Sequence, residues 1–143
     1  MLGELNASEI DRVLRHNMIG RIGCHAFGKT YVVPITYVYE GNAVYAHSDE
    51  GMKLHMMREN PHVAFEVDCI DEAGNWESVM ATGLFQEIAH GEAHKRFRWL
   101  IDTLSDHLKG PPGETVHPRE GRIPSTMYRI ILSEKTGRFE RRL

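Results

Sequence analysis

The sequence has little cysteine and no long hydrophobic run, and both absences exclude classes of protein. Only two cysteines, Cys24 and Cys69, occur among 143 residues, and they are far apart. A disulfide framework and a zinc knuckle are therefore excluded, and both thiols are expected to be buried in strands. No apolar stretch approaches the roughly 20 residues that cross a bilayer. The N-terminal segment MLGELNASEID also lacks the basic start and apolar core of a signal peptide, so we expect a cytoplasmic protein without membrane contacts.

A strong charge of either sign is also missing. The formal net charge is only -3, which provides no general attraction for nucleic acid, and no nucleic-acid partner is expected. Any anionic ligand must therefore be held by a few local groups. With 41% hydrophobic and 26% charged residues, the composition is that of one globular domain, which we expect to span residues 1–143.

The hydrophobic patterns predict a chain made mainly of strands joined by turns, with three helices. The first three strands are separated by the turns Phe27-Gly28-Lys29 and Glu40-Gly41-Asn42, so they are expected to form a meander. The predicted strands are 18–26, 30–39, 42–47, 62–68, 76–88 and 125–132, and the predicted helices are 8–15, 49–58 and 89–108.

Individual residues predict where these elements begin, bend and end. Ser8 with Asp11 resembles a capping box at the start of the first helix. Strict alternation makes 62–68 the clearest strand. Gly83 predicts a bulge or bend in the fifth strand, and Gly137 predicts a turn after the last strand.

The segment KGPPGETVHPREGRIP, residues 109–124, holds four of the six prolines and must be a loop. A loop of this length in a compact domain is more often functional or interfacial than idle. Six strands joined mostly by tight turns, with peripheral helices, predict a mainly β fold, a small six-stranded antiparallel barrel rather than a βαβ sheet.

Two motifs suggest other functions but lack the required context. Residues 23–30, GCHAFGKT, match the P-loop pattern, yet the following YVVPITYVY is β-branched and contains Pro34, so it cannot form the helix that a P-loop needs. His90 and His94 are spaced i and i+4, as in helical metal sites, but no third ligand is indicated. We therefore predict neither a nucleotide triphosphatase nor a metal site.

The strand-to-helix segment His47-Ser48-Asp49-Glu50-Gly51-Met52-Lys53 carries the main functional signal. A lysine in the first turn of a helix opposes the helix dipole, so Lys53 either points into water or meets an anion. Ser48 can cap the helix or donate to a phosphate, and Gly51 lets a ligand approach the backbone. Pro34 removes a ladder donor from the second strand, which indicates an edge, a bulge or a place where something else packs. The residues alone leave these alternatives open.

The order of the segments adds information. TYVVPITYVYEGNAVYAHSDEGMKLHMMRENPHVAFEVD followed by WESVMATG resembles the pyridoxamine 5'-phosphate oxidase-related, FMN-binding split-barrel family, most closely its nitroimidazole-resistance-protein-like branch. The similarity covers residues 8–88 well and the remainder only in outline. It consists of Val-Pro-Ile-Thr in one strand, Tyr-Ala-His-Ser ending the next, Gly-Met-Lys opening the helix, Asn-Pro, and Ser-Val-Met-Ala-Thr-Gly in the fifth strand.

The resemblance implies a homodimer of split barrels with one FMN in each of two clefts at the subunit interface. Trp76 and Trp99 are expected to serve in packing rather than on the substrate side of the ring. The implied cofactor-binding residues are Val33, Pro34, Ile35 and Thr36 along the isoalloxazine ring, His47 and Ser48 beside the ribityl phosphate, Met52 and Lys53 closing over it, and Ser78 from the fifth strand.

One difference from pyridoxamine 5'-phosphate oxidase itself, the enzyme after which the family is named, bears on the activity. The oxidase carries an arginine just before the lysine as a second phosphate contact, where this chain has Met52, and its basic C-terminal signature is not recognisable in SEKTGRFERRL. Vitamin B6 oxidation is therefore not expected. The resemblance implies an FMN-dependent oxidoreductase, nitroreductase-like or pyridoxamine-phosphate-oxidase-like, whose small-molecule substrate the sequence does not identify. Our first hypothesis is the reduction of nitroaromatic or similar small molecules with electrons from NADH or NADPH. The alternatives are a flavin- or haem-binding carrier or sensor, and a reductase that uses the deazaflavin F420.

Overall fold

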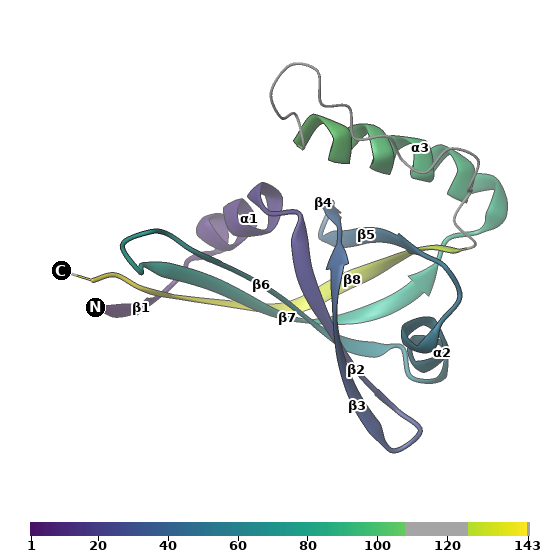
Figure 1. Ribbon diagram of the computed structural model, residues 1–143, viewed down its shortest axis with the longest axis horizontal. Coiled ribbons are helices and arrows are strands. Elements are labelled where there is room, and N and C mark those ends of the chain that lie inside the picture. Colours follow the sequence, from purple (N-terminus) through teal and green to yellow (C-terminus); the bar gives the residue numbers. More distant parts are fainter. Residues whose placement is uncertain (108–125, 143) are drawn as a thin grey trace.

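The computed structural model describes residues 1–107 and 126–142, and within this range only the backbone of His90, Ala93, His94, Phe97 and His107. The loop predicted at 109–124 and the side chains of the pair His90 and His94 therefore lie outside the described residues. The described chain is mainly β, with an antiparallel sheet and helices at its periphery (Figure 1), as the sequence predicted.

Eight strands and three helices make up the described residues. In chain order they are β1 (Leu2–Glu4), α1 (Ala7–His16), β2 (Ile19–Ala26), β3 (Lys29–Thr36), β4 (Val38–Glu40), β5 (Ala43–Ser48), α2 (Met52–Glu59), β6 (His62–Ile70), β7 (Trp76–Glu87), α3 (His90–His107) and β8 (Thr126–Glu140).

The sheet runs in the order β3-β2-β6-β7-β8-β5-β4, with β1 paired to β8. Both hairpins of the predicted three-stranded meander form, β2 with β3 and β4 with β5. They do not make one continuous meander, because β3 pairs only with β2, and β5 pairs on its other side with β8. The second predicted strand divides at Tyr37 into β3 and β4, which lie at opposite ends of this order. Tyr37 is 1% exposed, and its hydroxyl donates to the Leu14 carbonyl at 2.8 Å. The ladder is not closed, but the chain itself joins its two ends through Tyr37.

The predicted number of strands is therefore too low by two. One additional strand comes from the division at Tyr37. The other is β1, whose Leu2, Gly3 and Glu4 pair with Glu140, Phe139 and Arg138. The pattern LGELN carried no alternation that would have indicated a strand so short.

The last strand is longer than predicted, because Gly137 lies inside β8 rather than in a turn. Gly137 faces Val79 across the ladder, and its carbonyl accepts from the Leu5 amide at 2.8 Å. A Cβ at position 137 would lie 2.8 Å from the Leu5 Cβ and 2.9 Å from Ile10. The glycine therefore permits the close approach of the segment before α1.

Helix α1 begins two residues earlier than a cap at Ser8 would give. Asn6 is the N-cap: its side chain accepts from the Glu9 amide at 2.9 Å, and the Glu9 carboxylate accepts from the Asn6 amide at 3.0 Å. This reciprocal pair satisfies two amide donors at the helix start. The predicted capping box exists, but with residues two positions earlier.

The predicted alternation and bulge are confirmed. Val63, Phe65 and Val67 of β6 are buried at 6%, 0% and 0% exposure, and the β7–β8 register shifts between Ala81 and Gly83. A second, smaller core lies under α3, where Trp99 packs edge-on against Tyr45 with ring centroids 5.3 Å apart. Trp99 therefore serves in packing, as expected.

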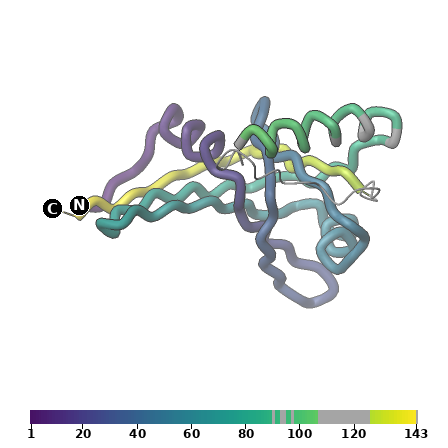
Figure 2. Tube along the Cα trace, turned by 45° about the horizontal axis from the view of Figure 1, so that its top comes forward, coloured from purple at the N-terminus to yellow at the C-terminus, as the bar shows by residue number. Residues whose placement is uncertain are grey.

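The strands β6, β7 and β8 extend into a long arm that ends beside both termini (Figure 1). In the turned view of Figure 2, α1 and α3 lie toward one side of the sheet, and the β2–β3 hairpin and α2 extend toward the other. The phosphate-binding segment predicted from the sequence lies in this second region, where β5 leads into α2.

Candidate functional site

The segment between β5 and α2 brings four of the predicted residues together. His47 and Ser48 end β5, and Met52 and Lys53 open α2 after the N-cap Gly51. The Ser48 hydroxyl donates to the Asp49 carbonyl at 2.8 Å, and no side chain of the described residues caps the helix. Ser48 is therefore not the helix cap, and the first amides of α2 remain available for a ligand.

Lys53 is the half-buried cation of this segment. Burial lowers the pKa of Lys53, and no carboxylate of residues 1–107 and 126–142 lies within ion-pair distance of its amine. A desolvated ammonium without a counter-charge is unfavourable on its own. The position therefore suits an anionic ligand group, and a phosphate fits it.

His47 lies close enough to Lys53 for their charges to interact. Burial lowers the pKa of His47, Asp49 acts to raise it, and Lys53 acts to lower it. In the single chain the imidazole is therefore held toward its neutral form, although the residue still reaches solvent. An anion beside both groups would relieve this repulsion.

Strand β3 carries the four residues expected along the isoalloxazine ring: Val33, Pro34, Ile35 and Thr36. It lies at one end of the sheet order, so within the described residues it is an edge strand, as Pro34 indicated. Its side chains alternate: Ile35 is buried at 5% exposure and Val33 is partly buried, whereas Pro34 and Thr36 are exposed. Pro34 pairs with Arg21 and Thr36 with Ile19.

The structure does not bring Ser78 beside these residues within one chain. Ser78 pairs with Arg138 of β8, whereas Ser48 pairs with Thr126 of the same strand. These two positions on β8 are roughly 40 Å apart along an extended strand. Along the sheet, β2 and β6 also separate β7 from β3.

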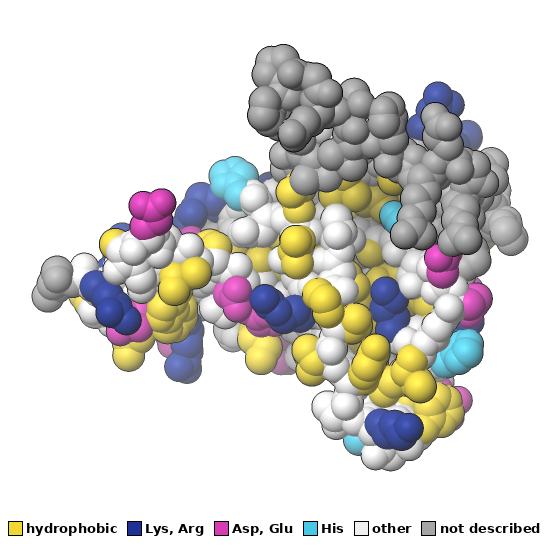
Figure 3. Space-filling model, in the orientation of Figure 1, with side chains coloured by type: hydrophobic (Ala, Val, Ile, Leu, Met, Phe, Trp, Pro, Cys, Tyr) yellow, Lys and Arg dark blue, Asp and Glu magenta, His cyan; other side chains and the backbone are white. Residues whose placement is uncertain are grey.

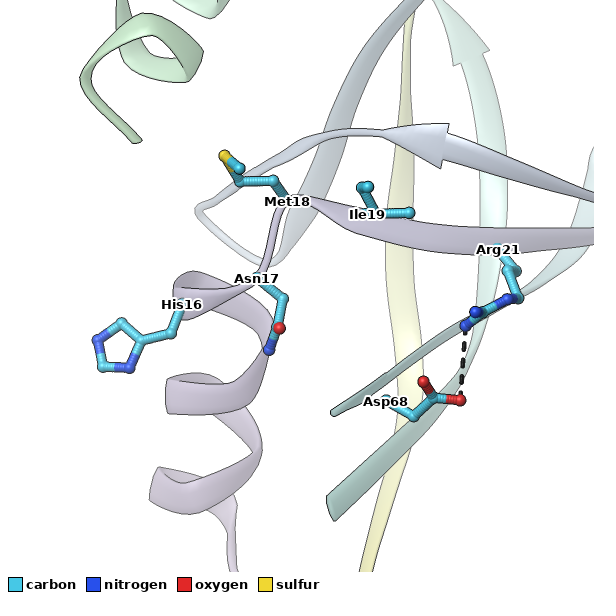
Figure 4. Close-up of a pocket in the computed structure, with 6 residues that line it drawn as sticks. All are labelled: His16, Asn17, Met18, Ile19, Arg21 and Asp68. Atoms are coloured by element: carbon cyan, nitrogen blue, oxygen red, sulfur yellow. Dashed lines mark ion pairs between the residues drawn. The ribbon is translucent and has the colours of Figure 1, made fainter. Parts of the chain in front are cut away.

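An open hollow of about 450 Å³ lies on the β2 side of the edge strand. His16 and Asn17 come from the end of α1, and Asp68 comes from β6 (Figure 4). In Figure 4, Arg21 reaches Asp68 through an ion pair of 3.5 Å, while His16 points away from them. The residues that line the hollow are His16, Asn17, Met18, Ile19, Arg21 and Asp68.

Arg21 also pairs with Glu66 at 3.1 Å. The pKa of Glu66 is raised, mainly by burial and further by the neighbouring Asp68. The hollow thus has a polar wall beside the strand that carries Pro34. No sequence pattern indicates this cluster, because Arg21 comes from β2 and Glu66 and Asp68 come from β6.

Arg58 is a further residue near the predicted site that sequence reasoning missed. Its guanidinium donates to both carboxylate oxygens of Glu50, at 2.6 and 2.7 Å, and also to Glu87. Arg58 holds the pKa of Glu50 down to about 2. Glu50 and Arg58 are eight positions apart, a spacing that indicates no helix-surface pair.

Exposed hydrophobic side chains gather over the β2–β3 hairpin and α2 (Figure 3). Val32 is 64% exposed on the edge strand, and Ile19 is 59% exposed beside it. Large exposed apolar groups on neighbouring elements are typical of an interface. The described helices include none with the length and apolar character needed to cross a bilayer, and the described side chains form no group of three or more metal-ligating residues.

The family model described as pyridoxamine 5'-phosphate oxidase matches residues 6–139. An uncharacterized protein of Rhizobium meliloti (strain 1021) is 30% identical over 139 residues, which cover 94% of this chain and 92% of that protein.

Solved structures show the same fold. A FAD-binding protein from Mesorhizobium loti is 31% identical, covers 99% of each chain and superimposes with a TM-score of 0.80. A candidate 5-nitroimidazole antibiotic resistance protein from Bacteroides thetaiotaomicron is 19% identical, covers 97% of this chain and 87% of its own, and has a TM-score of 0.73. At that identity the likeness shows the fold alone.

Proposed function

Because the chain belongs to the pyridoxamine 5'-phosphate oxidase family, we propose that it is a flavin-dependent oxidoreductase that binds FMN where β5 leads into α2. The observation that carries this proposal is Lys53, a half-buried cation without a carboxylate partner in the described chain, at the uncapped start of a helix. A phosphate there would receive the charge of Lys53 and the first amides of α2. The Ser48 hydroxyl would also donate to it after turning away from the Asp49 carbonyl.

The isoalloxazine ring would lie along the edge strand β3. Pro34 and Thr36 face outward and can contact the ring through their side chains, whereas the buried Ile35 can contribute only its backbone. Pro34 has no amide hydrogen, so no donor on this residue requires a partner where a planar ring replaces a neighbouring strand. His47 and Met52 would close the phosphate end of the site.

The functional unit would be a homodimer. The exposed apolar side chains Val32 and Ile19 support an interface at the edge strand. Ser78 lies too far along β7 to reach the phosphate of its own chain, so in this proposal it contacts the flavin bound mainly by the other subunit. Each of the two clefts would then contain residues of both copies.

Bound flavin supplies hydride or single-electron transfer, and the residues of the chain bind and orient it. The hollow beside β2, with its polar wall and the apolar Met18 and Ile19, is large enough for a small molecule. We propose a nitroaromatic or similar small acceptor as substrate and NADH or NADPH as electron donor. Met52 replaces a phosphate-binding arginine of the oxidase itself, which argues against vitamin B6 oxidation.

FAD is the second candidate cofactor, because the 31% identical neighbour is a FAD-binding protein. Mass determination of the chromophore released from purified protein separates the two flavins directly. An absorbance band of haem, or the mass of a deazaflavin, would contradict both. Protein that carries no chromophore and does not quench added FMN or FAD would refute the proposal.

Turnover is tested separately from binding. The flavin-loaded protein is mixed anaerobically with NADH or NADPH and followed by absorbance, and a nitroaromatic acceptor is then added. We expect bleaching by the donor and recovery of colour on addition of the acceptor. A flavin that binds but is not reduced by either donor would indicate a carrier or sensor.

A further inference from the structure

We propose that Arg58 is a positioning residue for the flavin phosphate: through Glu50 it fixes the turn that places Ser48, Lys53 and the first amides of α2 around one point. This inference rests on the proposed flavin function. Arg58 itself lies near the far end of α2 and would not touch the cofactor.

The turn is held from two sides by the side chain of Glu50. Arg58 binds both of its carboxylate oxygens, at 2.6 and 2.7 Å, in the two-pronged arrangement that fixes orientation as well as distance. The Thr126 hydroxyl donates to the same carboxylate at 3.2 Å. Thr126 is also the residue that pairs with Ser48 in the β5–β8 ladder. Through Thr126, the side chain of Glu50 is therefore held at a fixed position relative to the end of β5.

Arg58 is in turn fixed to the sheet. Its Nε donates to Glu87, the last residue of β7, and one Nη lies 3.5 Å from the Thr126 hydroxyl. The guanidinium thus joins the turn before α2 to the end of β7 and the start of β8.

Two further contacts of the turn are local in sequence: the Ser48 hydroxyl donates to the Asp49 carbonyl at 2.8 Å, and the His55 imidazole lies 3.7 Å from a carboxylate oxygen of Glu50. Gly51 has no side chain, and a Cβ placed there would have nothing within 4 Å. Asp49 and Glu50 are both exposed. Side chains of Arg58 and Glu50 are 36% and 48% exposed, and ion pairs at such exposure contribute little to global stability. The expected consequence of losing the pair is therefore a displaced turn in a folded protein.

The charges of this network separate a positioning role from an electrostatic one. With His55 neutral, Glu50 and Glu87 together carry one more negative charge than Arg58 can neutralise. Removing the charge of Glu50 would strengthen the binding of an anion if only long-range electrostatics mattered. If Glu50 positions the turn, the same change weakens binding. The two roles therefore predict opposite signs.

The test titrates flavin-free protein with FMN and follows the quenching of flavin fluorescence in Glu50→Gln and Asp49→Asn. Asp49 is the matched control, an exposed acid of the same turn outside the network. We expect Glu50→Gln to weaken FMN binding about tenfold, the lower end of the losses seen when hydrogen-bond partners of metal ligands are removed. Asp49→Asn should bind FMN as tightly as the parent or more tightly. Equal or tighter binding by Glu50→Gln would overturn the proposal.

A second comparison uses Arg58→Met in the parent and in Lys53→Ala, with the thermal unfolding of each flavin-free protein as a check on folding. Because Arg58 acts through the turn that carries Lys53, we expect a loss of about tenfold in the parent but less than about threefold in Lys53→Ala. Equal factors in both backgrounds would reject the coupling. If the parent itself fails to quench FMN fluorescence, the proposed function fails. If the parent binds FMN and the variants bind it equally tightly, the positioning role alone fails.

Discussion

At the scale of single residues, the proposed anion site before α2 depends on the half-buried amine of Lys53. We predict that Lys53→Ala weakens FMN binding by about 1.5 to 3 kcal/mol, the value expected for a lost hydrogen bond to a charged group. Fluorescence titration measures the change, and Lys29→Ala is the control, since Lys29 is exposed in the β2–β3 hairpin. Equal losses of FMN affinity in the two variants would show that Lys53 does not contact the phosphate.

His47 gives the site a pH dependence whose sign follows from its lowered pKa. In flavin-free protein a base with a lowered pKa binds fewer protons folded than unfolded, so its contribution to stability falls as pH drops below the ordinary value of 6.5. A phosphate beside the imidazole favours its protonated form.

We therefore predict that FMN binding near pH 6 takes up more protons in the parent than in His47→Gln. Calorimetric titrations in two buffers of different ionisation enthalpy measure this difference. Equal proton uptake in the two proteins would show that the phosphate does not lie beside His47.

At the scale of elements, most helices and strands were predictable because each carries its own periodicity. The division at Tyr37 was not, because TYVVPITYVY is rich in strand-forming residues throughout. Its two halves pair with the neighbouring strands β2 and β5, and these are held apart in the sheet by their distant partners β6 and β8. The site shows the same contrast. His47, Ser48 and Lys53 could be predicted as a group because they are close in sequence, whereas Arg58, Glu50 and Glu87 meet only in the folded chain.

The inclusion of Gly137 in β8 leads to a prediction about stability. Gly137→Ala should destabilise the protein by about 1 to 3 kcal/mol, because the new methyl would overlap Leu5 and Ile10 in a packed region. Urea denaturation measures the free energy of unfolding. Gly91→Ala is the contrasting variant: no atom lies within 4 Å of a Cβ there, and alanine favours a helix. Similar stability of Gly137→Ala and the parent would show that β1 and α1 lie further from β8.

At the scale of the whole molecule, the exposed apolar residues of the edge strand predict association. Val32→Glu, on β3, should convert a dimer into monomers and lower FMN affinity, because each cleft would lose the residues of its second subunit. Light scattering coupled to gel filtration measures the mass. Leu2→Glu, equally apolar and exposed but at the tip of the arm, should leave the mass unchanged. A monomeric parent that binds FMN fully would contradict the dimeric site.

The position of β5 between β4 and β8 has a consequence for the chain as it is synthesised. The β2–β3 hairpin can form as soon as it leaves the ribosome, but β5 has only the three-residue β4 beside it until the final strand emerges. Its outer row of amides and carbonyls stays unpaired while more than half of the protein, residues 49–125, is translated. The nascent β4–β5 hairpin is therefore the segment on which a chaperone would act.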